Sequence, residues 1–306
     1  MKTIHFAPLQ GYTTYIYRQV HARYAGGVDA YYTPFIRWEK GQVRNKDIND
    51  ILPEHNENIC LIPQIICSDT DELKRLTDIV ASYGYKQINI NLGCPAPMQT
   101  KLMRGSGMLP HPDKLESLLK EVENYKQDVN FSVKMRLGFE NNDEWRQLTD
   151  LLNESCVNQI IMHPRVGKQM YKGEVDMDAF QEFYELCTKP LFYNGDIVSL
   201  DQLRTIEEKY PKLSGIMLGR ALLGQPFLAT EYKNGVINDE ERRRIILDMH
   251  DDLFAYCVDK YKADSQVLLH IHAFWEYMEP YMIRKQWKKL MKAGSMKNYK
   301  EALKQI

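Results

Sequence analysis

Asn89-Ile90-Asn91-Leu92-Gly93-Cys94-Pro95 is the stretch from which the fold is best inferred. The apolar run 87–92 stops at a Gly-Cys-Pro turn, which predicts a short buried strand. Because proline cannot continue a strand ladder, Cys94 is expected at the end of that strand, where a thiol can meet a ligand. A single cysteine is more often a small buried hydrophobe, so its role depends on the rest of the chain.

Seven further apolar runs alternate with polar segments that are typical of helices, such as 70–82, 112–124 and 142–153. This alternation over about 230 residues predicts a (β/α)8 TIM barrel in residues 1–235. A doubly wound open sheet is the alternative, but polar residues follow nearly every run, as the mouth of a barrel requires. The eight runs are 4–6, 30–35, 61–66, 88–92, 131–135, 159–163, 191–193 and 215–218.

The composition is that of an ordinary globular protein, with 306 residues, 44% hydrophobic content and a net charge of -1. The six cysteines are far apart and show no metal-ligand spacing, so we expect reduced thiols, no metal site and a cytoplasmic protein. No signal peptide or membrane span is recognisable. No protein partner is implied, and a monomer is expected.

The ends of the first, third and fifth runs carry candidate ligand contacts. Pro8 turns the chain after the first run, and Gln64 interrupts the third. A buried glutamine needs partners for its amide, so a ligand contact and a core network are equally good interpretations. Strand alternation places Lys134 and Arg136 on one face of the fifth run. Two cations there would be costly unless an anion or an electron-rich ring lies beside them, and Arg136 is a candidate substrate contact.

The last three runs also end in polar residues. His163 and Arg165 follow the sixth run, and the loop after them carries Lys168, Tyr171 and Lys172. Arg165 and these three loop residues are candidate substrate contacts, since such side chains can hold a phosphate backbone or stack on a base. Asn194-Gly195-Asp196 ends the seventh run. Gly219-Arg220 ends the eighth, directly before a short helix, which is typical of a phosphate site.

Residues 236–306 show no strand signal and are expected to form a separate helical domain. Ile245, Met249 and Leu253 recur at helical spacing, which indicates a packing stripe. Residues 281–306 contain eight lysines and arginines against one glutamate, and Arg284, Lys288 and Lys292 share one helical face. A solvated outer face is the usual explanation, but the excess also suits contacts with phosphates.

The ordered set of motifs resembles the tRNA-dihydrouridine synthase family. The likeness rests on 91–95 with Gly105-Ser106-Gly107, and on 133–138, 163–165, 169–173, 194–197 and 219–220. It implies an FMN-binding barrel, a helical tRNA-binding domain and NADPH as transient reductant. By the same likeness Cys94 is the proton donor and Asn91 helps to hold the uracil. The residues it assigns to the flavin are Pro8, Gln64, Lys134, His163, Asn194, Gly195, Asp196, Gly219 and Arg220.

The chain departs from the family pattern at Leu9, Tyr12 and Thr14, at Pro164 and Val166, and at Met108. None of these positions removes the cysteine or the flavin cations. The expected reaction is therefore reduction of the C5=C6 bond of a uridine in the tRNA D-loop. Two alternatives remain open: an FMN barrel acting on a free pyrimidine, and a tRNA-binding protein without catalysis.

Overall fold

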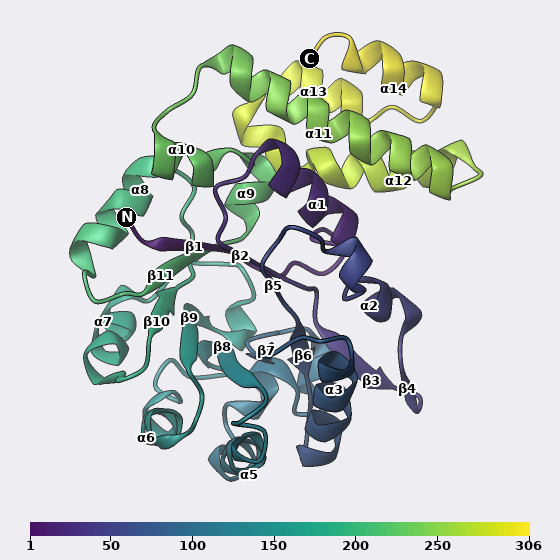
Figure 1. Ribbon diagram of the computed structural model, residues 1–306. Coiled ribbons are helices and arrows are strands. Elements are labelled where there is room, and N and C mark those ends of the chain that lie inside the picture. The colour runs from purple at the N-terminus through teal and green to yellow at the C-terminus, as the bar shows by residue number, and fades with distance from the viewer.

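The computed structural model describes residues 1–306 and confirms the predicted (β/α)8 barrel (Figure 1). Each of the eight predicted runs forms a strand, and all eight are parallel to their neighbours in the barrel. In chain order the barrel strands are β1 (Thr3–Phe6), β2 (Ala30–Tyr32), β5 (Leu61–Ile62) continued by β6 (Gln64–Ile66), β7 (Gln87–Leu92), β8 (Asn130–Gly138), β9 (Gln159–Val166), β10 (Leu191–Tyr193) and β11 (Gly215–Leu218).

The barrel closes through the segment 61–66, which is paired on both sides. Its first half, β5, pairs with β2, and its second half, β6, pairs with β7. Pro63 separates the two halves because it has no backbone N–H to give to a ladder. On the far side β1 lies between β2 and β11, so no barrel strand is left with a free edge.

Helices follow the barrel strands and surround the sheet. Two of the predicted helices match closely, since α3 begins after the Asp69 cap and α5 begins with Pro112. The third begins at Arg146 rather than Asn142, because the Glu144 carboxylate accepts the N–H groups of residues 139–141 and holds that segment as a turn. The helices are α1 (Tyr15–Tyr24), α2 (Asn45–Asn49), α3 (Thr70–Ser82), α4 (Pro97–Thr100), α5 (Pro112–Glu123), α6 (Arg146–Glu154), α7 (Met177–Leu186), α8 (Leu200–Lys209), α9 (Arg220–Gly224) and α10 (Leu228–Asn234), with 3-10 turns η1 (Pro53–His55), η2 (Gly105–Met108) and η3 (Gly167–Gln169).

A small hairpin was not predicted. It consists of β3 (Ile36–Glu39) and β4 (Gln42–Val43), joined by Lys40 and Gly41 with φ angles of 51° and 84°. Positive φ at both central residues is the geometry of a two-residue hairpin turn. The β3 strand continues β2 and pairs with β6, so the hairpin extends the barrel wall outward.

After Gly235 the chain is entirely helical, as predicted. Its elements are α11 (Asp239–Lys260), α12 (Asp264–Trp275), η4 (Glu276–Tyr281), α13 (Arg284–Met291) and α14 (Met296–Leu303). The stripe of Ile245, Met249 and Leu253 is buried. Figure 1 shows these helices together above the barrel, where α11 packs on α1 and η4 packs on α9. No helix is both long and apolar enough to cross a membrane.

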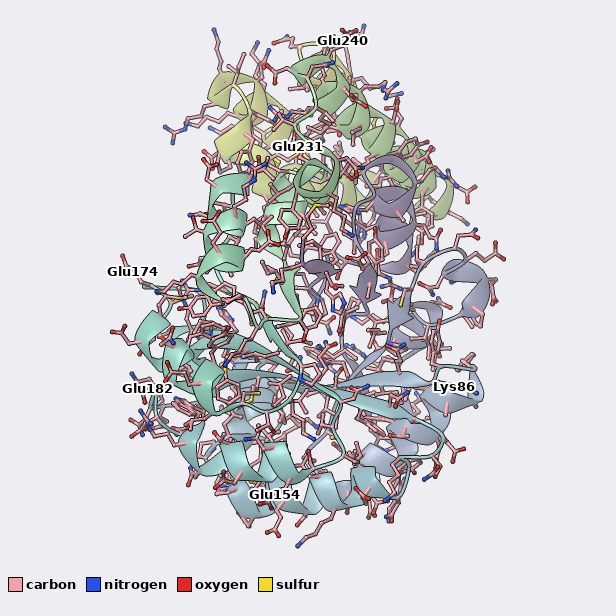
Figure 2. The ribbon with its side chains drawn as sticks, turned by 60° about the vertical axis from the view of Figure 1, so that its left-hand side comes forward. Lys86, Glu154, Glu174, Glu182, Glu231 and Glu240 are labelled. Carbon is pink, nitrogen blue, oxygen red and sulfur yellow. The ribbon has the colours of Figure 1, made fainter.

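A buried carboxylate joins the barrel to these helices. Glu231 on α10 is 3% exposed and accepts a hydrogen bond of 2.7 Å from the Arg242 guanidinium of α11. Figure 2 shows Glu231 between the barrel and the helices, with Glu240 farther out. A paired buried charge of this kind fixes the start of α11, because an unpaired one would be costly.

Candidate active site

A cavity of about 800 Å³ opens at the carboxyl ends of the barrel strands. This is the end of a (β/α)8 barrel at which catalytic residues collect. Its lining includes all ten residues expected to be catalytic or to bind the cofactor, together with four of those expected to bind substrate. These fourteen are Pro8, Gln64, Asn91, Cys94, Lys134, Arg136, His163, Arg165, Tyr171, Asn194, Gly195, Asp196, Gly219 and Arg220.

Cys94 is held at the cavity wall by its own backbone. The Asn91 Oδ1 atom accepts the N–H groups of Gly93 at 3.0 Å and Cys94 at 2.8 Å, which forms an Asx turn at the end of β7. The Cys94 carbonyl accepts the N–H of Ser106 at 3.0 Å. A Cβ on Gly105, whose φ is +60°, would lie 2.6 Å from that carbonyl oxygen, so only glycine fits there. The motif 105–107 therefore packs against the Cys94 backbone and holds it in place.

The Cys94 thiol is a protonated group at neutral pH. Burial raises its pKa above the ordinary value, and the nearby cations Arg136 and Lys134 oppose this only in part. A thiol that keeps its proton is suited to general acid chemistry rather than to obligatory nucleophilic attack.

Lys134 points into the cavity without a partner. Its Nζ makes no hydrogen bond or ion pair with the protein, and it enters from β8, where Lys134 is paired in register with Asn91. Burial, together with the charge of Arg136, lowers its pKa to about 7. An ammonium left in this state is stabilised by any ligand that presents an electron-rich edge.

Arg136 shares the inner face with Lys134, as the strand alternation predicts, but its guanidinium is occupied. Its Nε donates to the Gly93 carbonyl at 3.0 Å and its Nη1 to the Val166 carbonyl at 2.8 Å. The side chain is 2% exposed, and burial lowers its pKa to about 10. Arg136 therefore ties the ends of β7 and β9 together behind the cavity.

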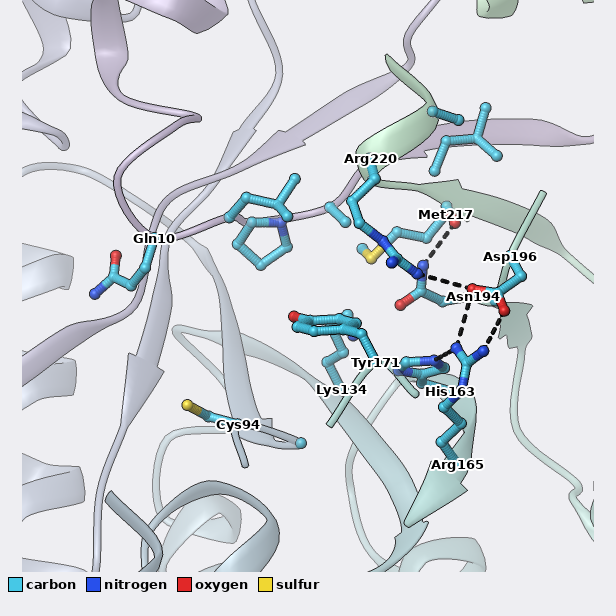
Figure 3. Close-up of a pocket in the computed structure, with 18 of the residues that line it drawn as sticks. Gln10, Cys94, Lys134, His163, Arg165, Tyr171, Asn194, Asp196, Met217 and Arg220 are labelled. Atoms are coloured by element: carbon cyan, nitrogen blue, oxygen red, sulfur yellow. Dashed lines mark hydrogen bonds and ion pairs between the residues drawn. The ribbon is translucent and has the colours of Figure 1, made fainter. Parts of the chain in front are cut away.

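Asp196 lies between two guanidinium groups, at the wall of the cavity away from Cys94 (Figure 3). It accepts hydrogen bonds from Arg165 at 2.9 Å and from Arg220 at 2.8 Å. Burial opposes ionisation of Asp196, but the hydrogen bonds and charge of Arg165 and the charge of Arg220 outweigh it and lower the pKa. Arg165 is 1% exposed and also donates to the Gly173 carbonyl, so it braces the loop after β9 from inside. Arg220 remains partly open to the cavity.

His163 lies beside this cluster and is uncharged. Burial, and then the charges of Arg136 and Lys134, lower its pKa well below the ordinary value. Its Nε2 is 3.2 Å from Nη1 of Arg165, which suits an imidazole nitrogen that accepts a hydrogen bond. A neutral histidine adds a polar contact to the cavity without adding a further charge.

Tyr171 places an aromatic ring over these cations. The guanidinium carbons of Arg220 and Arg136 lie 4.7 and 5.5 Å from its ring centroid. Its ring is also stacked on His163, with centroids 6.5 Å apart. Cys94 lies apart from Tyr171 and its neighbouring cations, as Figure 3 shows. The aromatic residue predicted in this loop is therefore at the cavity, and about half of it is exposed.

A glycine lets the backbone form the remaining wall at the end of β10. A Cβ on Gly195 would lie 2.8 Å from the Tyr193 hydroxyl, whereas one on Gly219 would make only an ordinary contact, 3.4 Å from the Ala7 side chain. Asn194 is fixed by a hydrogen bond of 2.8 Å to the Met217 carbonyl. The ends of β10 and β11 therefore present backbone rather than side chains next to Arg220.

Gln64 is part of a core network. Its amide donates to Asn89 and accepts from Asn91, both at 2.7 Å, while the residue still borders the cavity. Of the two interpretations of this glutamine, the network is therefore realised.

The other residues expected to contact substrate lie outside the cavity. Lys168 pairs with Glu140, and Lys172 is exposed on the same loop. Arg284, Lys288 and Lys292 are exposed on α13 and at its end, with Leu290 buried beneath them. The structure thus separates a deep pocket from a basic outer surface.

Part of the rim could not be found from sequence patterns. Tyr277 and Tyr281 of η4 reach the cavity from the C-terminal helices, and Tyr12 joins them with its hydroxyl 2.7 Å from Glu276. Tyrosines scattered in a helical segment carry no motif. The only available signal was that Tyr12 stands in a segment that departs from the family pattern.

The fold and the site together define a (β/α)8-barrel protein with a thiol and a set of cations around one pocket. The family model for dihydrouridine synthase (Dus) matches residues 5–306. The chain belongs to the dihydrouridine synthase family, whose members are oxidoreductases.

Named relatives agree with this assignment. The tRNA-dihydrouridine synthase B of Pasteurella multocida is 29% identical over 231 residues, which cover 74% of this chain and 67% of that protein. The tRNA-dihydrouridine(16) synthase of Aquipseudomonas alcaligenes is 29% identical over 235 residues, which cover 74% of each chain.

Solved structures with this fold are more distant in sequence. Histamine dehydrogenase from Rhizobium sp. 4-9 matches with a TM-score of 0.57 at 9% identity, over 82% of this chain and 48% of that one. Morphinone reductase matches with a TM-score of 0.52 at 8% identity, over 79% and 88%. These similarities establish the barrel alone.

Proposed function

We propose that this protein reduces the C5=C6 bond of a uridine in the D-loop of tRNA to 5,6-dihydrouridine, with FMN in the pocket and NADPH as the reductant. The observation that carries the proposal is the Cys94 thiol at the wall of a pocket whose other walls hold Lys134 and Arg220. Membership of the dihydrouridine synthase family supports the reaction.

The pocket residues fit a flavin mononucleotide. Lys134 is a partly buried cation without a partner, which suits the electron-rich N1/C2=O edge of a flavin ring. Arg220 can hold a phosphate with two parallel hydrogen bonds, beside the backbone of Gly219. Pro8, His163, Asn194 and Gly195 complete the walls. When bound, reduced flavin supplies the hydride that adds to C6 of the uracil.

Cys94 supplies the proton in this scheme. The C5=C6 bond is conjugated to the C4 carbonyl, so addition of hydride at C6 places negative charge toward C5. The Sγ proton moves to C5, and the resulting thiolate lies near Arg136 and Lys134, which stabilise it. Asn91 orients the thiol through the backbone N–H of Cys94 and retains one amide hydrogen that can reach the base.

The target uridine must leave the folded tRNA to enter a pocket at the end of a barrel. Extrusion costs a few kcal/mol of stacking, which contacts with the surrounding RNA offset. Tyr171 can stack with a base at the entrance, and Lys168 and Lys172 flank it. Arg284, Lys288 and Lys292 on α13 can contact phosphates farther out.

Four further features belong to the same proposal. Residues 1–235 form the catalytic domain and residues 236–306 the tRNA-binding domain. The protein acts as a monomer, since one chain supplies both the pocket and the basic surface. It works in the cytoplasm, where tRNA and NADPH are available together.

The test is to map dihydrouridine in tRNA from cells with and without this protein, and then to repeat the reaction with purified protein, FMN, NADPH and unmodified tRNA. Loss of one or more dihydrouridines on deletion, restored by wild type but not by Cys94→Ala, is the expected result. Unchanged dihydrouridine with reduction of free uracil would replace the proposal by a pyrimidine reductase. A purified protein that binds tRNA but no flavin would replace it by a binding protein.

A further inference from the structure

Four polar side chains form a ladder inside the barrel beneath Cys94. They are Gln64 on β6, Asn89 and Asn91 on β7, and Ser132 on β8, and none is more than 8% exposed. Sheet register pairs Gln64 with Asn89 and Asn89 with Ser132, so these three side chains lie at one level of the interior. Asn91 lies one level higher, next to the thiol loop.

The backbone at Cys94 fixes the direction of the first rung. The N–H groups of Gly93 and Cys94 can only donate, so the Asn91 atom that meets them at 3.0 and 2.8 Å must be its carbonyl oxygen. The Asn91 amide nitrogen then points at Gln64 and must donate, at 2.7 Å, to the Gln64 carbonyl oxygen. Neither amide can be turned over without placing two donors or two acceptors face to face.

The same rule continues down the ladder. The Gln64 amide nitrogen donates at 2.7 Å to the Asn89 carbonyl oxygen, and the Asn89 nitrogen donates at 2.8 Å to the Ser132 hydroxyl oxygen. Because every amide is buried, each reversed rung would leave buried polar groups without hydrogen-bond partners. The three amides therefore share one orientation, which is set at the Cys94 end.

A hydroxyl ends the ladder because it can both accept and donate. Ser132 accepts from Asn89 at 2.8 Å, so the ladder ends on an oxygen that suits the donor above it.

We propose that Asn89 is a positioning residue for the reaction at Cys94, acting through Gln64 and Asn91 without touching the substrate. This inference rests on the proposed function, because Cys94 is taken as the acid. Without a carbonyl oxygen at position 89, the Gln64 amide nitrogen loses its acceptor, and only the hydrogen bond from Asn91 still holds the Gln64 side chain. The partner of Asn91 is then held less firmly, and the turn that aims the thiol loosens. Displacement of a catalytic group by about 1 Å costs about 100-fold in rate.

Two variants separate orientation from packing. Asn89→Leu has the same number of side-chain heavy atoms with the same branching but offers no acceptor to Gln64. Asn89→Asp retains an oxygen toward Gln64, while the Ser132 hydroxyl can turn to donate to the second carboxylate oxygen. If Asn89 serves only to fill the core, leucine is the better replacement, because it buries no charge. If it orients the amides, aspartate is the better replacement.

The experiment measures kcat and KM for unmodified tRNA, FMN content, and the alkylation rate of Cys94 by iodoacetamide, followed by peptide mass spectrometry. For Asn89→Leu we expect kcat to fall about 10- to 100-fold with KM for tRNA and FMN content within about threefold of wild type. We expect its Cys94 alkylation rate to change at least about threefold, because the thiol environment sets reactivity. Asn89→Asp should remain within about threefold of wild type in every measurement. Asn158→Leu, an exposed asparagine before β9, is the matched control.

Equal kcat values for Asn89→Leu and wild type would overturn the inference, as would a leucine variant more active than the aspartate variant. Alkylation does not require tRNA, so it separates the two hypotheses. If wild type makes no dihydrouridine yet alkylation responds as expected, the proposed function fails and the positioning of Cys94 stands. If dihydrouridine forms and alkylation is unchanged, the positioning role fails alone.

Ser132→Ala provides a second variant if the aspartate protein does not fold. It removes only the lower acceptor, so we expect a fall in kcat of about three- to tenfold. The double variant with Asn89→Leu should be no slower than Asn89→Leu alone, because both changes break one chain of interactions. Additive losses would refute the ladder.

Discussion

Lys134→Met should stabilise the flavin-free protein while it removes a cofactor contact. The Lys134 ammonium has no protein partner, and burial followed by the charge of Arg136 lowers its pKa from an ordinary 10.5 to about 7. Between these two values the unfolded chain binds the proton more tightly than the folded one, so wild-type stability rises with pH across this window. Below pH 7 the lysine is protonated in both states, so the full cost of the unpaired Lys134 charge to the folded state is present.

The magnitude follows from the same shift. A fall from 10.5 to about 7 makes the lysine cost the folded state about 4 kcal/mol at pH 7 and about 1 kcal/mol at pH 10. Methionine has nearly the same length and carries no charge, so it removes this cost at every pH. The gain in the free energy of unfolding should therefore be about 4 kcal/mol at pH 7 and about 1 kcal/mol at pH 10, apart from a constant contribution of the methionine itself.

The assay is urea unfolding of the flavin-free protein at pH 7 and pH 10, followed by tryptophan fluorescence. Lys172→Met is the control, since Lys172 is exposed and its replacement should change stability by less than about 0.5 kcal/mol. A Lys134→Met gain that is the same at both pH values, or a loss at pH 7, would refute the account of Lys134 as a strained, unpartnered cation. The same variant should bind FMN more weakly than wild type, because methionine cannot supply the positive charge that Lys134 offers to the flavin.

Three other substitutions test the separate parts of the site. Cys94→Ala should keep FMN in full but reduce tRNA at least about 100-fold more slowly, as measured in a single turnover with pre-reduced enzyme. Arg220→Leu should weaken FMN binding about 10- to 100-fold in a fluorescence titration, while Arg220→Lys recovers part of the affinity. Reversing Lys288 and Lys292 to glutamate should raise KM for tRNA at least about tenfold with flavin content unchanged, and the effect should shrink at high salt. An unchanged KM in that variant would remove α13 from the RNA-binding surface.

Much of the site follows from strand periodicity alone. Most barrel strands are apolar runs that end at or next to glycine or proline, so the residues directly after them had to lie at the mouth of the barrel. Lys134 and Arg136 could be assigned to one face because side chains alternate along a strand. The same alternation could not say which of the two remains free. Arg136 donates hydrogen bonds to the carbonyl groups of Gly93 and Val166. The Lys134 ammonium has no hydrogen-bond partner in the protein.

Tertiary structure decided what sequence could not for the charges near the rim. Arg165 looks like a loop cation in sequence, yet it is buried against Asp196 and Gly173. The start of α6 moved because one carboxylate, Glu144, outcompetes helix formation by binding three N–H groups. Both outcomes depend on partners that lie outside the local pattern.

By itself, the sequence determined the barrel, the order of its strand ends, the helical region after Gly235 and the position of Cys94 at the end of a strand. It did so because apolar periodicity and turn residues act locally. The tertiary structure alone decided that Gln64, Asn89, Asn91 and Ser132 form one directed ladder to the thiol. That ladder joins three strands, and the register that aligns them arises only when the barrel closes.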